Sequence, residues 1–476
     1  MSYADAIRPV RNKMRKFSYV SVLRSLSAYM QRTDALTGEQ RARRMPWIAE
    51  RLGAWALRDR PSMYLTAPMS SSDLAACMNL AWKQMDTGVT WMRSGNPLDL
   101  SIRTMLLSQL PYQLPQETGA FARQVDLLRR IGPDTKLYRA LERALGMSPE
   151  VYLRVAVFIW SMADERIEDV FSPMYVRAMT LAFGQEAIAA FLRTVIIPHE
   201  RMESVSGEGI VEDEWFQPNL LYRSPFVTYR GERFYWGRAC LQRNIEFAFS
   251  DIVGRSADDA VRRTFEGAFE SYVGDSLRRC CPHVLSEQEI VERFNVNGSC
   301  NDFAVLGDNY IVLVEAKNKA LTHTLTATGS AKTYKSKFKA TVVKAASQLE
   351  NVVHHVRVDA EFMHARIHQV IVTYGDLMLG NGQFIFEAAE DAEIPLVLSI
   401  DQLDRLLEAI RIGRCTFDEF FEDYRKHQKF PQTRLFSPGQ LLAESKYRLS
   451  EQPTHLQSIL NPFFDSISAL AEKYIV

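Results

Sequence analysis

The sequence lacks the paired cysteines of a structural zinc site or a redox centre. Its six cysteines are dispersed along 476 residues, and none occurs in a CxxC pair. No apolar run reaches the roughly 18 residues that a membrane-spanning helix requires, and the N-terminal segment lacks the continuous apolar core of a secretory signal. We therefore expect a protein of the reducing cytoplasm with no membrane partner.

The chain also lacks net charge, because 57 basic residues balance 57 acidic ones. This balance argues against a protein that is basic throughout and coats nucleic acid non-specifically. The charge is unevenly distributed, however. Residues 1–60 hold thirteen Lys and Arg against five Asp and Glu, and residues 316–349 hold seven Lys and no acidic residue. We interpret the first region as solvated helix surface and the second as a candidate nucleic-acid contact.

With 47% apolar residues the chain can bury large cores, and its length predicts two or three domains. Helical spacing of apolar residues predicts a mostly helical recognition or regulatory domain over residues 1–215. Two aromatic and β-branched runs around Arg230-Gly231-Glu232 predict a hairpin within a connecting segment, residues 216–260. A helical C-terminal appendage is expected over residues 413–476.

Between these segments, residues 261–412 mix helix and strand patterns. An amphipathic helix precedes two strand-like runs, "DFAVL" and "YIVLVEAK", joined by a turn sequence. After a Lys- and Thr-rich loop come a second helix, the strands "HQVIVTY" and "IPLVLSI", and the helix "DQLDRLLEAI". The order α-β-β-α-β-β-α predicts a mixed α/β core, so the expected fold class is α+β with a large helical N-terminal domain.

Charge interrupts the apolar pattern in "NDFAVLGDNYIVLVEAKNK", residues 301–319. Asp302 opens one strand and Glu315 nearly closes its hairpin partner, so the two carboxylates are expected side by side across the ladder. Two carboxylates about 4 Å apart repel by roughly 4 kcal/mol at an effective dielectric near 20. Because a cation would offset this repulsion, we expect a divalent metal, Mg²⁺ or Mn²⁺, to bind there.

Alternation along the second strand places Lys317 on the same face as Glu315, while Ala316 points away and leaves its carbonyl oxygen near the metal. A lysine in that position can orient or help to deprotonate a metal-bound water. It can also offset charge as a phosphodiester becomes pentacovalent. The pattern therefore predicts phosphodiester hydrolysis.

An Asp in one strand, Glu-x-Lys in the next and a preceding amphipathic helix with a Glu together resemble the PD-(D/E)xK, or restriction-endonuclease-like, nuclease superfamily. The resemblance covers roughly residues 261–410, and Asn301 stands where that family often has proline. It implies a restriction-endonuclease-like core, in which helices flank a central mixed sheet, and a Mg²⁺-dependent endonuclease activity.

The resemblance implies further site residues. In this family a helix glutamate often completes the metal site, and Glu270 matches it, with Glu266 one turn earlier as the alternative. A glutamine on the helix after the core strands is matched by Gln348, which completes the catalytic set with Asp302, Glu315 and Lys317. The lysines after the second strand are expected to contact nucleic-acid phosphates: Lys319, Lys332, Lys335, Lys337, Lys339 and Lys344.

Simpler interpretations remain open for each residue. Asp302 could be a turn residue, and Glu315 with Lys317 an exposed pair on an edge strand, although the apolar run before Glu315 favours a strand buried on both faces. Asp308 is a rival acid, but its place between Gly307 and Asn309 suits a turn.

For the whole protein we expect a DNA endonuclease, by analogy with prokaryotic restriction and anti-phage defence. The N-terminal domain could assemble a homodimer or hold a partner protein. The alternatives are an RNA-cleaving nuclease and a catalytically silent nuclease-fold protein that binds nucleic acid or acts as a scaffold.

Overall fold

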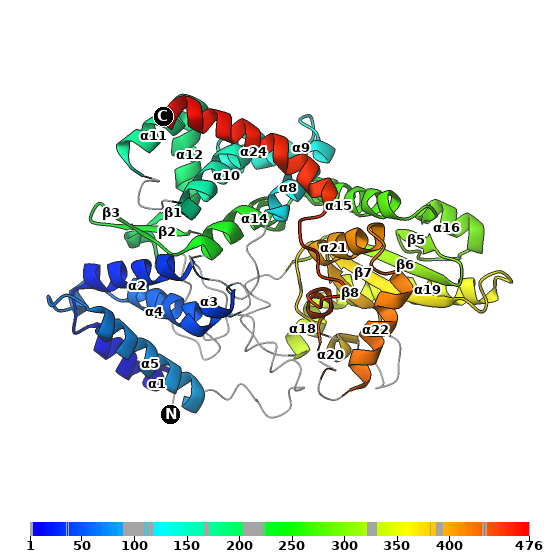
Figure 1. Ribbon diagram of the computed structural model, residues 1–476, viewed down its shortest axis with the longest axis horizontal. Coiled ribbons are helices and arrows are strands. Elements are labelled where there is room, and N and C mark those ends of the chain that lie inside the picture. Colours follow the sequence, from blue (N-terminus) through cyan, green and yellow to red (C-terminus); the bar gives the residue numbers. More distant parts are fainter. Residues whose placement is uncertain are drawn as a thin grey trace.

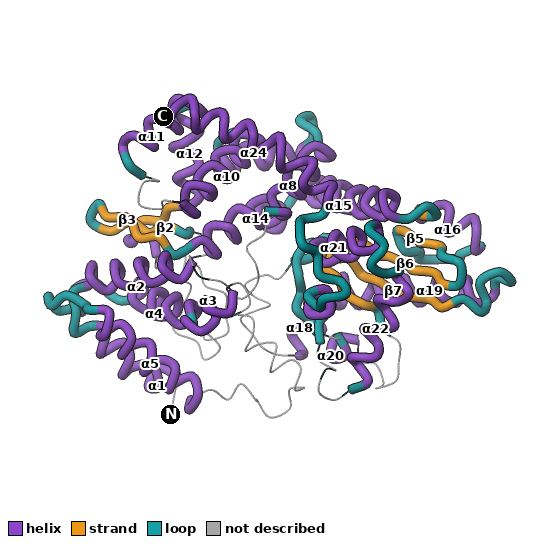
Figure 2. The backbone as a smooth tube through the Cα atoms, viewed as in Figure 1, coloured by secondary structure: helices purple, strands orange, loops and turns teal. Residues whose placement is uncertain are grey.

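A computed structural model describes residues 3–34, 36, 38–88, 109, 112, 118–165, 171–202, 221, 224–320, 331–380, 382–386, 394–430, 433 and 436–475. The described chain is mostly helical and contains two mixed β-sheets (Figures 1 and 2). This confirms the expected combination of helices and sheets, with helices dominating the N-terminal half. No helix in these ranges is long and apolar enough to span a membrane.

The first helices share one hydrophobic core with the smaller sheet. The helices of this core are α1 (Tyr3–Met14), α2 (Tyr19–Asp34), α4 (Pro46–Arg58) and α5 (Ser71–Gly88). The short helix α3 (Gly38–Arg44) lies between α2 and α4 in the chain, and the 3₁₀ turn η1 (Pro61–Met63) lies between α4 and α5. The sheet has the order β1-β2-β3 and consists of β1 (Ile196–Pro198), β2 (Phe226–Tyr229) and β3 (Glu232–Tyr235). Arg230 and Gly231 both have positive φ, 50° and 80°, so β2 and β3 form the predicted tight hairpin.

A second and larger core joins the next helices to the C-terminal half of the chain. It includes α8 (Gly119–Ile131), α9 (Lys136–Leu145), α10 (Pro149–Glu165), α11 (Pro173–Phe183), α12 (Gln185–Val195), α14 (Arg238–Arg255) and α24 (Thr454–Ile475). Helix α24, red in Figure 1, lies against α8 and α11. The chain therefore returns at its last helix to helices that formed more than 250 positions earlier.

The second sheet has five strands in the order β4-β5-β6-β7-β8. The first two pairings, β4 with β5 and β5 with β6, are antiparallel, whereas β6 with β7 and β7 with β8 are parallel. The strands are β4 (Val284–Ser286), β5 (Phe303–Leu306), β6 (Tyr310–Lys317), β7 (Arg366–Thr373) and β8 (Leu396–Ser399). The hairpin of β5 with β6 and the later strands β7 and β8 were predicted, whereas β4 was not.

Helices cover both faces of this sheet. The even-numbered residues Val312 and Val314 of β6 belong to the core under α15 (Asp259–Cys280), α21 (Ile400–Arg411) and α22 (Phe417–Lys429). Their odd-numbered neighbours Ile311 and Leu313 belong to a third core under α16 (Glu287–Phe294) and α19 (Lys344–Val358). Strand β6 is therefore buried on both faces, as its apolar sequence predicts.

The Lys-rich segment after β6 is partly helical, although its irregular pattern predicted a loop. Helix α18 (Ala331–Phe338) continues through a π-helical turn, η6 (Lys339–Val343), into α19. Two further short helices are α20 (Gln383–Phe386) and α23 (Pro438–Leu442). Phe338 and Val342 are buried in the core under α19, and this apolar contact outweighs the weak local pattern.

Helix α15 approaches β5 closely at one glycine. A Cβ built on Gly274 would lie 2.6 Å from two ring carbons of Phe303, the first residue of β5. Gly267 lies two turns earlier on the same helix, and its Cβ would meet nothing within 4 Å. Gly274 therefore lets α15 rest on the strand that follows Asp302.

We expect Gly274→Ala to destabilise the protein by about 1–3 kcal/mol, because the added methyl group overpacks the contact with Phe303. Gly267→Ala is the matched control and should stabilise the protein by about 0.5–1 kcal/mol through its higher helix propensity. Urea unfolding of the two variants measures both effects. Equal shifts for the two alanines would contradict the close contact.

Candidate active site

Asp302 and Glu315 lie side by side in the five-stranded sheet, Asp302 directly before β5 and Glu315 near the end of β6. The register pairs Phe303 with Val314, so the preceding and following residues, Asp302 and Glu315, face each other across the ladder. The Glu315 carboxylate accepts a hydrogen bond from the Asp302 amide at 3.2 Å, and the Asp302 carboxylate accepts one from the Ala316 amide at 2.7 Å. Both carboxylates lie on the face that α19 covers.

Glu315 is buried and Asp302 is half-buried, and the pKa of each acid is raised. The side chain of Glu315 has no exposed surface. Burial, followed by the charge of Asp302, raises the pKa of Glu315 to about 7. Burial also raises the pKa of Asp302, against the opposing effect of the Ala316 amide. The positive charges around the site therefore do not fully balance its negative charge.

Lys317 supplies part of the missing positive charge. Its ammonium group forms an ion pair with the Glu315 carboxylate, as expected for residues at alternate positions of one strand. The Lys317 side chain remains 25% exposed, whereas the Glu315 side chain is fully buried. The structure thus brings together the three residues that the sequence singled out.

Gln348 contacts the site indirectly. Its Nε2 donates to the Cys300 carbonyl at 2.9 Å, while its Oε1 is buried and has no hydrogen-bond partner among the described residues. Asn301 is fully buried, and its Nδ2 donates to the Phe303 carbonyl at 2.6 Å. Gln348 and Asn301 together hold the backbone that leads into Asp302. A catalytic role for Gln348 stays a prediction.

Glu270 lies on α15, the helix on the other face of the sheet. Its pKa is raised by desolvation first and then by the charges of Asp302 and Glu287. Glu270 and Glu266, one turn earlier on the same helix, are both exposed. The choice of Glu270 over Glu266 as the helix carboxylate stays a prediction, as does its role as a metal ligand.

Glu287 is an acidic neighbour that the sequence interpretation missed. It begins α16 directly after β4, and its charge raises the pKa of both Asp302 and Glu270. A signal for this helix was present, because Ser286 and Glu289 form a capping box at its N-terminus. Recognition of that box would have placed Glu287 in the first turn of a helix near the site.

The predicted phosphate-binding lysines fall into two groups. Lys337, Lys339 and Lys344 are exposed on α18, the π-helical turn and α19. Lys319 and Lys335 are half-buried, and burial followed by the charge of Lys337 lowers the pKa of Lys319. The side chain of Lys332 lies outside the described residues. Contact of these lysines with nucleic acid stays a prediction.

The donor set suits a hard divalent cation. Among the described residues no group of three or more His, Cys, Asp and Glu side chains is arranged to hold a metal. Mg²⁺ is usually bound through only one or two carboxylates, with water and substrate oxygens completing its octahedron. The paired carboxylates Asp302 and Glu315, with their excess negative charge, fit that requirement. The predicted contribution of the Ala316 carbonyl stays a prediction.

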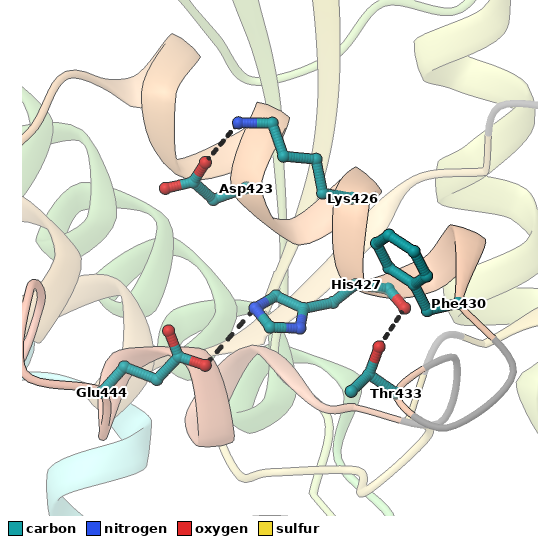
Figure 3. Close-up of a pocket in the computed structure, with 6 residues that line it drawn as sticks. All are labelled: Asp423, Lys426, His427, Phe430, Thr433 and Glu444. Atoms are coloured by element: carbon teal, nitrogen blue, oxygen red, sulfur yellow. Dashed lines mark hydrogen bonds and ion pairs between the residues drawn. The ribbon is translucent and has the colours of Figure 1, made fainter.

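A surface pocket of about 430 Å³ lies elsewhere, between α22 and α23 (Figure 3). Its acid Asp423 is already bound by Lys426 at 2.8 Å and by Lys446 at 2.7 Å. The pocket includes none of the carboxylates discussed above, so it offers no rival to the paired acids. Its lining residues are Asp423, Lys426, His427, Phe430, Thr433 and Glu444.

We expect Glu315→Gln to weaken the pH dependence of stability. The unfolded chain releases the Glu315 proton near the ordinary pKa of 4.5, whereas the folded protein keeps it up to about 7. The contribution of Glu315 to stability therefore falls as pH rises through this window, and relative to wild type the variant should lose about 1–3 kcal/mol less between pH 5 and pH 8. Urea unfolding at the two pH values measures the difference. Parallel losses would show that Glu315 is not protonated in the folded state.

Searches against protein families, curated proteins and solved structures find no match to this chain. The geometry of the paired carboxylates and of Lys317 is therefore the basis for any statement about function.

Proposed function

We propose that the protein is a metal-dependent nuclease that hydrolyses internal phosphodiester bonds, with DNA as its substrate. The observation that supports this most strongly is the cross-strand pair of the half-buried Asp302 and the buried Glu315, which is joined to the ammonium group of Lys317. Burial of two like charges is costly without a cation. An energetically costly pair of acids with raised pKa values is typical of a functional site.

The five-stranded sheet supports the same proposal. Its two antiparallel pairings followed by two parallel ones form a mixed sheet, with α15 over one face and α19 over the other. This is compatible with the restriction-endonuclease-like core that the resemblance implies. Only the arrangement of strands and helices is compatible with that core, so the chemistry of the site is the main support for the proposed function.

Each residue would have a defined part. Asp302 and Glu315 would hold the divalent ion, which when bound would lower the pKa of a water molecule and stabilise the leaving oxygen. The Ala316 amide keeps the Asp302 carboxylate turned toward Glu315. Lys317 would orient the attacking water and offset the charge that develops on the phosphate oxygens, since its ammonium group lies against the Glu315 carboxylate.

The exposed lysines after β6 support a nucleic-acid substrate. Lys337, Lys339 and Lys344 expose ammonium groups on the helical segment that follows β6, where they could neutralise backbone phosphates. Such contacts do not distinguish DNA from RNA, so RNA is the second substrate to test.

We expect Asp302→Ala and Lys317→Ala each to lower cleavage of plasmid, linear duplex or single-stranded DNA at least about 100-fold, because the first removes a carboxylate that would hold the ion and the second removes the ammonium group that would offset charge on the phosphate. Asp308→Ala is the matched control: it removes an exposed acid from the turn of the same hairpin and should leave cleavage unchanged. The assay compares Mg²⁺, Mn²⁺ and EDTA, with RNA in parallel. A protein that binds DNA without cutting it under every condition would instead be a silent nuclease-fold scaffold.

Metal binding can be measured without activity. Ions that bind only the folded state raise stability, by about 2.7 kcal/mol at one hundred times the dissociation constant. We expect Mn²⁺ at pH 8 to raise the melting temperature of the wild type by a few degrees. Asp302→Asn should remove this increase and Asp308→Asn should keep it. An increase that survives Asp302→Asn would place the ion elsewhere.

A further inference from the structure

A second surface pocket, of about 320 Å³, lies between α9 and the start of α15. Helix α9 packs beside α15 in the upper part of the molecule (Figure 1). The pocket is lined by three basic side chains of α9, which we call the basic face of α9: Lys136, Arg139 and Arg143. One acidic side chain, Asp258, lines it from the residue before α15. The lining therefore has more positive than negative charge.

The basic face of α9 is a straight row along one side of the helix. Its residues follow one another at intervals of three and four positions, so they point within about 60° of each other around the helix axis. The opposite side of α9 is apolar and buried: Leu137, Leu141 and Leu145. Packing of that apolar side against the core thus turns the three cations outward together.

Little negative charge balances this row. The Lys136 ammonium group lies 4.0 Å from the Asp258 carboxylate, and their side chains are 72% and 50% exposed. Asp258 also accepts a hydrogen bond from the Ala260 amide at 2.8 Å, as the N-cap of α15. Among the residues that the structure describes, no acidic side chain forms an ion pair with Arg139 or Arg143. Two guanidinium groups in this pocket can therefore bind an external anion.

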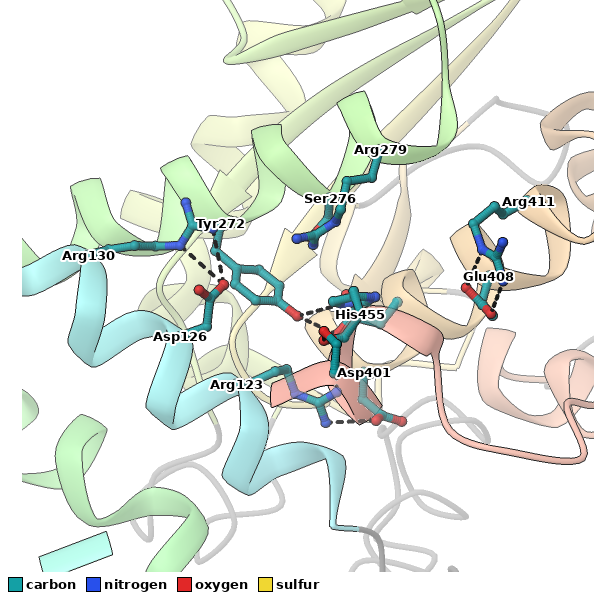
Figure 4. Close-up of polar contacts among 12 residues, drawn as sticks. Arg123, Asp126, Arg130, Tyr272, Ser276, Arg279, Asp401, Glu408, Arg411 and His455 are labelled. Carbon is teal, nitrogen blue, oxygen red and sulfur yellow. Dashed lines mark hydrogen bonds and ion pairs between the residues drawn. The ribbon is translucent and has the colours of Figure 1, made fainter. Parts of the chain in front are cut away.

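The arginines of the neighbouring helix α8 are used differently (Figure 4). Arg123 donates to Asp401 at 2.7 Å, and Arg130 donates to Asp126 at 3.0 Å. Their charges are thus neutralised by acids within the fold. The two arginines of the basic face of α9 stand four positions apart and repel each other, which weakens the helix. Their placement is explained better by a ligand than by the packing of α9.

The pocket suits a row of phosphate groups. Guanidinium groups bind phosphate oxygens through paired N–H donors. Its described lining contains no aromatic side chain on which a nucleobase could stack. The basic face extends about 10 Å along α9, and one strand of B-DNA carries about three phosphate charges over that distance. A row of three cations matches a linear polyanion better than a single small anion.

We propose that the basic face of α9 binds the phosphate backbone of nucleic acid, as a second contact outside the candidate active site. This contact reads no sequence, because side chains bound to phosphates do not reach base edges. It gives the N-terminal half of the chain a part in holding the nucleic acid. The inference rests on the proposed function in taking nucleic acid as the partner, and it requires no cleavage.

The test measures binding of a short fluorescein-labelled DNA duplex to the full-length protein, by fluorescence anisotropy in EDTA over a range of salt concentrations. Each phosphate contact contributes about 0.9 to the slope of log K against log salt concentration, so Arg139→Ala/Arg143→Ala should weaken binding and reduce the slope by about 1.8. Arg139→Lys/Arg143→Lys keeps both charges and should keep the wild-type slope. Alanine favours helix, so α9 should stay folded.

The matched control is Arg60→Ala/Arg177→Ala, which removes the same charge from two exposed positions outside the pocket. It should leave the slope unchanged. Titration calorimetry with inorganic pyrophosphate tests the other source of phosphate. Pyrophosphate binding that is lost in Arg139→Ala/Arg143→Ala, with an unchanged slope for DNA, would overturn the inference and assign the pocket to a small phosphorylated ligand.

The outcomes separate this inference from the proposed function. An unchanged slope in the pocket variant, or an equal fall in the control, would overturn the inference and leave the proposed function intact. If the slope falls as expected but no condition yields cleavage, the inference holds and the proposed function fails. A wild type that binds no DNA would overturn both.

Discussion

The alternation of side chains along β6 determines how the C-terminal half of the protein is assembled. Val312 and Val314 pack on one face of the strand, in the core under α15. Ile311 and Leu313 pack on the other face, in the core under α19. The same alternation continues to the end of β6 and places Glu315 and Lys317 on the α19 face. Asp302 lies on this face too, across the ladder from Glu315. A register slip of one residue would turn a carboxylate into the core under α15, so packing and site geometry are specified together.

The sequence alone predicted the parts of the fold whose signals are local. Strand β6, its turn and the long helix α15 each show a pattern over eight or more residues, and the cross-strand meeting of Asp302 and Glu315 follows from hairpin geometry. Strand β4 has only three residues, which is too short for a periodic signal. Segment 331–343 depends on the burial of Phe338 and Val342, which is a tertiary contact that a local pattern does not contain.

Long-range polar contacts were equally beyond the sequence. Arg123 and Asp404 are 281 positions apart, and each has the ordinary appearance of a surface charge on an amphipathic helix. In the fold both are buried, with 7% and 0% of their side chains exposed. Removal of one partner from such a pair typically costs about 3–5 kcal/mol. The hydrogen bonds of Arg123 to Asp404 and Asp401 join α8 to α21.

The return of α24 to α8 and α11 has a consequence for synthesis. The core that supports α15 contains both Phe121 of α8 and Ile467 of α24. During translation the early helices emerge long before their last partner, at about 5–20 residues per second. They must wait for tens of seconds with an uncovered apolar face, so the nascent chain is exposed to aggregation until residues 454–475 leave the ribosome.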